Sequence, residues 1–436
     1  MAMDDSVRQH QDSSAVNATI LVVHGGYSSV AERRSVAPDV VGSTPTSRPK
    51  GTPTPSDSAR SISPSQRASC IHRSSMMRSA NDAQFLMQPS YPTGESVSDP
   101  AWLKEFRPRR GLRQGDLQTL AANFLPRALQ LPVAENAIVE VDATTHSRLL
   151  CHCNWQPEPV RSRRMTLLVV HGLEGSSQSQ YMLGNAAKAW RAGWNVIRMN
   201  MRNCGGTEAL SPTLYHSGLS GDVRAVAQFF AALHNLAHIA WVGYSMGGNM
   251  VLKAAGEYGE QPPHWLRAVV GVSPVVDLSP SADALHDPRN RIYEWNFLRN
   301  MLRRYRRKVE LFPDRFTLEN CNRIHSIRTY DEYIVAPNCG FLGADDYYDR
   351  AASARVIDRI TVPALVLHAL DDPFIRILPD TREKICSNPN IAFVETKHGG
   401  HCAFLATAIA SDDGYWAEST LQSFIQSTAA SASGQN

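Results

Sequence analysis

The chain has 436 residues, of which 44 are Lys or Arg and 41 are Asp or Glu, so its formal net charge is +3. A nearly balanced charge gives no global indication of a nucleic-acid partner, and no apolar run in the sequence is long enough to span a bilayer. The length suits one large domain with insertions, or two domains.

Eight cysteines are scattered without the regular spacing of a disulfide framework. In a chain of this size, that pattern predicts reduced thiols and a cytoplasmic location. Cys151-His152-Cys153 has ligand-type side chains, but it lies in an alternating strand pattern and lacks a second ligand pair, so we predict no metal site there. The cysteines are Cys70, Cys151, Cys153, Cys204, Cys321, Cys339, Cys386 and Cys402.

Residues 1–90 differ in composition from the rest of the chain. Ser, Thr, Pro and Arg dominate from Ser28 to Ser75 without a helical or strand period, which predicts disorder. The stretch from Ser28 to Pro49 resembles the peptide obtained by translating a tRNA gene. We therefore hypothesise that the natural protein starts between Met76 and Met87; the alternative is a genuine flexible arm.

Beyond residue 136, short apolar runs alternate with helical stretches. The first two runs alternate apolar and polar residues, as an antiparallel edge does, and the later runs are nearly continuous, as parallel strands covered on both faces are. This order predicts an α/β fold with a mostly parallel eight-stranded sheet covered by helices. The domain would span residues 91–430, followed by a disordered tail at 431–436. The expected strands are Ala137–Val141, Leu149–Cys153, Thr166–His171, Asn195–Asn200, Ile239–Gly243, Ala268–Ser273, Ala364–Ala369 and Ile391–Glu395.

The fifth expected strand runs into Gly243-Tyr244-Ser245-Met246-Gly247, and a helical stretch follows. A Ser with Gly two positions before and after it, between a strand and a helix, is the nucleophile elbow of α/β-hydrolases. Gly243 and Gly247 would permit a close backbone approach that side chains block. Ser245 is therefore the candidate nucleophile, although a Gly-rich turn with an incidental Ser gives the same five-residue pattern.

The segment between the sixth and seventh expected strands is too long for a single loop. We predict a helical cap inserted after the sixth strand, at about 278–355, and a helix at Arg291–Lys308 with arginines around an apolar face. The basic cluster at 303–308 has three interpretations: a solvated, salt-bridged face, a transient membrane-surface contact, or a nucleic-acid contact, for which no recognisable module surrounds it.

A Ser nucleophile needs a base to accept its proton and an acid to orient that base, and in this fold they follow in the order Ser, acid, His. Asp372 follows the strand Ala364–Ala369 at the expected distance, with Asp371 as the alternative. His401 ends a Gly-rich loop after the last strand and is the predicted base, with His398 as the alternative.

The tetrahedral intermediate of acyl transfer needs backbone N–H donors. One is expected from Met246, directly after the nucleophile, and the other from Leu173 in the loop after the third strand. In that loop Gly172 supplies a tight turn. We expect His171 to be a structural hydrogen-bonding residue and not a base.

Several motifs occur in the order in which they are found in the YheT-like, or abhydrolase-4, group of carboxylesterases. The resemblance runs from about residue 102 to 425, and it departs from the group at Gly115-Asp116, where the group usually has Asn-Pro-His or Gly-His. The matching motifs are Leu117-Gln118-Thr119-Leu120, His171-Gly172-Leu173-Glu174-Gly175, Asn203-Cys204-Gly205-Gly206, Tyr215-His216-Ser217-Gly218, the elbow itself, Gly340-Phe341 with Tyr347-Tyr348, Asp371-Asp372-Pro373-Phe374 and Gly399-Gly400-His401.

This resemblance implies an esterase of acyl esters, either lipid-like or of short to medium chain length, that uses Ser245, Asp372 and His401. We expect hydrolysis without a metal or organic cofactor, a small-molecule acyl ester as substrate, and no nucleic-acid partner. Two alternatives stay open at this point. One is an acyltransferase that uses the same triad, and the other is a non-catalytic binding protein on a hydrolase scaffold.

Overall fold

The computed structural model describes residues 71–72, 100–409 and 412–433. Within these residues, eight strands match the eight that the sequence predicts, with ends that differ by no more than two residues, and a ninth, β1, has only two residues. Most of the N-terminal segment and its proposed start lie outside the described residues. The strands are β1 (Ile71–His72), β2 (Glu135–Asp142), β3 (Ser147–Asn154), β4 (Met165–Val170), β5 (Asn195–Met199), β6 (His238–Tyr244), β7 (Leu266–Val272), β8 (Ala364–Ala369) and β9 (Ile391–Thr396).

These strands form one sheet in the order β1-β9-β8-β7-β6-β4-β5-β3-β2. Neighbours from β1 to β5 are parallel, and the β2–β3 hairpin is antiparallel at one edge, as predicted. Strands β4, β6, β7, β8 and β9 are consecutive in the sheet. Because parallel strands end at the same edge, the loops after β4, β6, β8 and β9 meet there.

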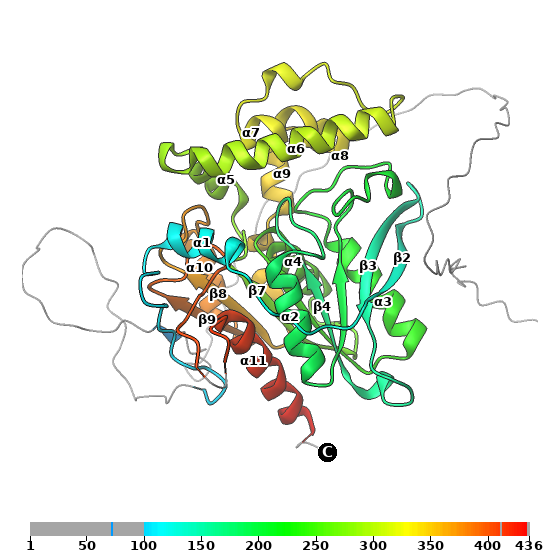
Figure 1. Cartoon of the computed structure of the whole chain (residues 1–436). Helices are drawn as coiled ribbons and strands as arrows, with labels where there is room; N and C mark the ends of the chain where they lie inside the picture. The colour runs from blue at the N-terminus through cyan, green and yellow to red at the C-terminus, as the bar shows by residue number, and fades with distance from the viewer. Residues whose placement is uncertain (1–70, 73–99, 410–411, 434–436) are drawn as a thin grey trace, which may run out of the picture. The chain divides into compact units, whose positions relative to one another are not determined.

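Helices cover both faces of the sheet (Figure 1). Helices α2 (Gln180–Arg191) and α11 (Trp416–Ser433) pack on one face, and α3 (Ser220–His234), α4 (Met246–Tyr258) and α10 (Pro379–Ser387) pack on the other. Along β6, Trp241 faces the second group, whereas Val242 faces the first, because successive side chains of a strand point to opposite faces. Helix α11 continues three residues into the segment predicted as a disordered tail.

The cap lies between β7 and β8, where the sequence predicts it, and Figure 1 shows its helices gathered on one side of the sheet. It has its own apolar core, to which Leu298, Met301 and Tyr305 contribute. The helix predicted at Arg291–Lys308 is α6, which ends three residues later. The cap contains α5 (Leu278–His286), α6 (Arg291–Leu311), α7 (Ile327–Tyr330), a π-helical turn (Asp331–Val335), α8 (Ala336–Cys339) and α9 (Ala344–Ala351).

Two basic residues of the cap cluster tie α6 to the sheet domain; Lys308 is buried and Arg304 is partly buried. Arg304 forms an ion pair of 3.0 Å with Glu174, and Lys308 donates to the carbonyl of Glu208 at 3.0 Å. Arg303 and Arg306 are exposed and have no ion pair within the described residues. The cluster is therefore partly structural and partly an exposed, unpaired basic face.

The cysteines differ in part from the prediction. Of the seven cysteines in the described residues, six are free thiols: Cys151, Cys153, Cys204, Cys321, Cys339 and Cys402. Cys386, however, is disulfide-bonded, so the prediction that all thiols are reduced is wrong at this position. Sequence spacing could not indicate this bond, because spacing does not say which cysteines meet in the fold.

Candidate active site

Ser245 lies in the turn between β6 and α4, with φ 54° and ψ −116°. This is an unusual backbone conformation for a residue with a side chain. Its N–H donates to the carbonyl of Val272 on the neighbouring strand at 2.9 Å. The turn is therefore held in place by the sheet.

The glycines around Ser245 allow backbone segments to approach closely. A Cβ at Gly243 would lie 2.1 Å from the carbonyl oxygen of Gly247, and a Cβ at Gly247 would lie 2.4 Å from that of His171. At Gly172, a Cβ would lie 3.1 Å from the Cβ of Ser245. A Cβ at Gly243 or Gly247 would therefore clash with backbone, and the contact between Gly247 and His171 shows that the loops after β4 and β6 pack directly against each other.

Asp372 and His401 are joined by a hydrogen bond of 2.9 Å from Nδ1 to Oδ2. The other carboxylate oxygen of Asp372 accepts from the N–H groups of Phe374 and Ile375, both at 3.0 Å. Burial by itself would raise the pKa of Asp372, but the charge and hydrogen bond of His401 lower it, so the net shift is downward. Asp372 is therefore held as an ionised carboxylate.

The two alternative residues pair with each other. Asp371 lies 3.5 Å from His398 and accepts from the N–H of Gly400 at 2.9 Å. Burial raises the pKa of Asp371. The loops after β8 and β9 thus carry two separate acid–histidine pairs, and His401, the partner of Asp372, is the histidine that lines the same hollow as Ser245.

The loop that carries His401 is tied to helix α1 (Gly115–Phe124), which contains the Leu117-Gln118-Thr119-Leu120 motif of the resemblance. Thr119 accepts from the N–H of His401 at 2.8 Å. The buried side chain of Gln118 accepts from the N–H of Leu405 at 2.7 Å and donates to its carbonyl at 3.2 Å. Phe374 packs edge-on against the imidazole, with ring centres 4.5 Å apart. These contacts fix the position of the ring.

The pKa of His401 is shifted upward. Burial by itself lowers it, but the Cys402 sulfur and the Asp372 carboxylate, each with a hydrogen bond to the ring, raise it by more. The imidazole is therefore a stronger base than an exposed histidine.

His171 is fully buried, and both of its ring nitrogens are occupied. Nε2 accepts from the N–H of Met201 at 3.0 Å, so Nδ1 carries the hydrogen and donates to the carbonyl of Gly172 at 2.8 Å. Burial lowers the pKa of His171 to about 4. A neutral imidazole with no free nitrogen positions the Gly172 turn and cannot act as a base.

The predicted N–H donors both lie beside Ser245. Leu173 and Met246 line one hollow together with Ser245 and His401. Within the described ranges, neither N–H donates to a protein acceptor, and Met246 is the first residue of α4, where the N–H groups have no helical partner. These groups are available to an oxygen atom near Ser245.

Comparison with known families agrees with this geometry. A family profile described as "alpha/beta hydrolase fold" matches residues 166–407, which is more than half of the chain. The chain belongs to the α/β-hydrolase fold family.

Several relatives within the α/β-hydrolases are named as hydrolases of esters. The chain is 28% identical to the Escherichia coli protein named "Putative esterase YheT", covering 74% of this chain and 93% of that one. It is 29% identical to the mouse phospholipase ABHD3, covering 56% and 59%, and 26% identical to the yeast monoacylglycerol lipase, covering 54% of each. The predicted resemblance to the YheT-like group is confirmed, and these similarities support an ester hydrolase.

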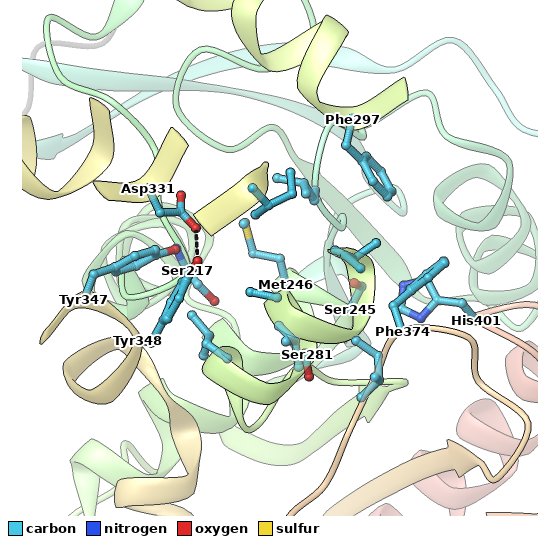
Figure 2. A pocket seen from close by; sticks show the side chains of 17 residues that line it. Ser217, Ser245, Met246, Ser281, Phe297, Asp331, Tyr347, Tyr348, Phe374 and His401 are labelled. Atoms are coloured by element: carbon cyan, nitrogen blue, oxygen red, sulfur yellow. Dashed lines mark hydrogen bonds between the residues drawn. The ribbon is translucent and has the colours of Figure 1, made fainter. Parts of the chain in front are cut away.

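Two hollows of this α/β-hydrolase meet at Ser245 and His401. The first, with a cavity volume of about 90 Å³, lies between the cap and the sheet domain. The second, about 390 Å³, lies between α1, the loop at 172–175, α6 and α11. Figure 2 shows Ser245, Phe374 and His401 at one end of the first hollow. Most of its remaining wall is apolar and includes Val275, Leu278, Ala282, Leu285 and Ile327.

The far end of the first hollow is polar, and its residues were not predicted as site residues. Asp331, Tyr347 and Tyr348 come from the cap, and Ser217 comes from the sheet domain (Figure 2). Tyr347, Tyr348 and Ser217 occur in motifs of the resemblance, which gave them no role. For Asp331 the sequence offered no signal.

No group of three or more His, Cys, Asp or Glu side chains in the described ranges is arranged to hold a metal ion. In the same part of the chain, no helix has both the length and the apolar character needed to cross a bilayer.

Proposed function

We propose that the chain is a serine hydrolase of carboxylic esters that works through an acyl-enzyme. The observation that carries this proposal is that His401, which is hydrogen-bonded to Asp372, lines the same hollow as Ser245. The similarity to esterases and lipases supports the same reaction class.

In the proposed reaction, His401 accepts the proton of Ser245 as its oxygen attacks the ester carbonyl. The N–H groups of Leu173 and Met246 stabilise the negative oxygen of the tetrahedral intermediate, and each such donor is typically worth about 10²–10³ in rate. His401 then protonates the departing alcohol. Water, activated by the same imidazole, attacks the acyl-enzyme and releases the acid and free Ser245. Asp372 keeps the hydrogen of the neutral imidazole on Nδ1 throughout.

The apolar wall of the first hollow supports an acyl chain as the group bound there. Burial of methylene groups stabilises the complex by about 0.8 kcal/mol each, so a chain of medium length would gain several kcal/mol. Lipid-like esters or esters of short to medium chain length are the proposed substrates.

The test is Ser245→Ala. Hydrolysis of p-nitrophenyl esters should fall by at least about 10³-fold, while the melting temperature stays close to that of the unchanged chain. Retained hydrolysis would contradict the proposal. His398→Gln is the matched control for a parallel His401→Gln variant, because His398 lies in the same loop but pairs with Asp371.

We also propose that the exposed face of α6 contacts anionic lipid surfaces. Ile292 and Trp295 on this face are 80% and 61% exposed, and the exposed Arg303 and Arg306 follow on the same helix. Apolar side chains beside unpaired arginines suit an anionic interface. Helix α6 also borders the second hollow, which opens toward Ser245.

This contact can be measured by co-sedimentation with phosphatidylcholine vesicles that contain or lack phosphatidylglycerol. Trp295→Ser combined with Arg303→Glu should abolish binding to anionic vesicles. Leu342→Ser, which removes an apolar cap side chain that is 97% exposed but lies outside α6, should not. Equal binding by all three proteins would contradict the proposal.

The six free thiols support a cytoplasmic location, whereas the disulfide at Cys386 is the opposing observation. Alkylation of thiols in intact cells, followed by mass spectrometry, tests this part of the proposal. Cytoplasmic protein should show Cys386 reduced in a substantial fraction of molecules.

A further inference from the structure

The polar end of the first hollow is built differently from the rest of its wall. Asp331 comes from the π-helical turn of the cap and is only 6% exposed. It faces the same hollow as Ser245, with apolar side chains between the two ends (Figure 2). A buried carboxyl at the end of an apolar hollow is costly unless it has hydrogen-bond partners.

The groups at this end use only part of their hydrogen-bonding capacity. Tyr348 donates to Oδ2 of Asp331 at 2.8 Å. Tyr347 accepts from the N–H of Ser217 at 3.0 Å, and the hydroxyl of Ser217 accepts from Asn249 at 2.9 Å. Within the described residues, Oδ1 of Asp331 has no hydrogen-bond partner, and neither do the hydroxyl hydrogens of Tyr347 and Ser217. One acceptor and two donors are therefore free.

A second buried acid of the cap provides a contrast. Both carboxylate oxygens of Glu294 are used within the cap, one by the N–H of Ile327 at 2.9 Å and the other by His286 at 2.9 Å. Glu294 therefore has a structural role, and neither of its carboxylate oxygens lacks a hydrogen-bond partner. Asp331 differs because one of its oxygens is unpaired and because it lines the hollow.

We propose that this end of the hollow binds a hydroxyl group carried by the acyl chain of the substrate. The inference rests on the proposed esterase function and refines its substrate class. A hydroxyl is neutral and both donates and accepts, so it can donate to Asp331 and accept from Tyr347 or Ser217. It would pair groups that a plain methyl end leaves unpaired.

Charged chain ends fit this site poorly. A carboxylate would lie beside the acidic side chain of Asp331 in a low-dielectric environment. An ammonium group donates but cannot accept, so it would leave the free hydroxyl hydrogens of Tyr347 and Ser217 unpaired. The neutral hydroxyl avoids both costs.

The test compares p-nitrophenyl esters of straight-chain acids, from hexanoate to hexadecanoate, with the corresponding esters that carry a terminal hydroxyl. At the chain length that reaches Asp331, kcat/KM for the hydroxyl ester should exceed that for the plain ester by about tenfold, the value of one buried hydrogen bond. Asp331→Asn should reduce this ratio to near one, and Tyr347→Phe should lower it by removing one of the two free donors.

Tyr333→Phe is the matched control. Tyr333 lies in the same π-helical turn as Asp331, but its hydroxyl accepts from Arg323 and it does not line the hollow. Tyr333→Phe should give the same ratio of kcat/KM for the hydroxyl ester to kcat/KM for the plain ester as the unchanged chain.

Two outcomes would overturn the inference. One is a ratio of one or less at every chain length. The other is a ratio that Asp331→Asn and Tyr347→Phe leave unchanged, because a purely structural role would lower kcat/KM for both esters alike. Failure of the esterase proposal looks different: no plain ester would be hydrolysed at all.

Discussion

Replacing Asp372 by Asn should disable the candidate base without disturbing the fold. Oδ1 of Asp372 accepts from two backbone N–H groups, at Phe374 and Ile375, and Oδ2 accepts from His401. The single carbonyl oxygen of Asn would keep the two backbone bonds, so its NH2 group would face Nδ1 of His401. Nδ1 must then accept, and the hydrogen moves to Nε2, the nitrogen that should receive the proton of Ser245.

The expected fall in kcat is about 10³–10⁴-fold, as is typical of an imidazole held in the wrong tautomer. This equals about 4–5.5 kcal/mol of lost transition-state stabilisation. Hydrolysis of p-nitrophenyl esters under saturating substrate measures it, and thermal unfolding verifies that the variant folds.

Asp371→Asn is the matched control, since Asp371 pairs with His398 and with the N–H of Gly400. We expect its kcat to stay within about threefold of the unchanged chain, as for a substitution outside the reacting groups. The reasoning fails if Asp372→Asn retains more than a tenth of the activity, or if Asp371→Asn loses as much as Asp372→Asn does.

Three further predictions concern the same fold. The pKa of His401 is raised, and His401 must be neutral to act as a base. The value of kcat/KM should therefore rise with pH, with a midpoint above about 6.5, the ordinary pKa of an imidazole. A midpoint below about 6 would contradict this. Gly247→Ala places a Cβ 2.4 Å from a backbone oxygen, so it should lower the free energy of unfolding, measured by urea titration, by about 2 kcal/mol or more. Gly221→Ala in helix α3 places a Cβ no closer than 3.9 Å to another side chain, so it should raise the free energy of unfolding by about 0.5–1 kcal/mol. Arg304→Met should cost about 3–5 kcal/mol, because it leaves the Glu174 carboxylate without its ion-pair partner and, among the described residues, only the hydroxyl of Tyr215 still donates to it. Adding Glu174→Gln should recover part of that loss in the same urea titration.

The sheet could be predicted because its strands are nearly continuous apolar runs separated by helical stretches. Eight of the nine strands in the described ranges follow from that pattern. The exception is β1, whose two residues are too few to give a period. The turn at Ser245 could be located because two glycines at fixed positions are needed where the loops after β4 and β6 approach each other.

Other features depend on contacts that no local pattern encodes. Asp371 and Asp372 are adjacent, and only the folded loop shows that they pair with different histidines. Gln118 binds the backbone of Leu405, which is 287 residues away. Asp331 lies in a π-helical turn, where the helical period of 3.6 residues does not say which way a side chain points.

Covalent labelling tests the central claim most directly. A fluorophosphonate should add one phosphonyl group per chain, and peptide mass spectrometry should locate it on Ser245. Labelling should be lost in Ser245→Ala and slowed by at least about 10³-fold in His401→Gln, because the serine oxygen is unreactive without its base. A chain that hydrolyses esters but carries the label elsewhere, or carries none, would contradict the assignment of Ser245 as the nucleophile.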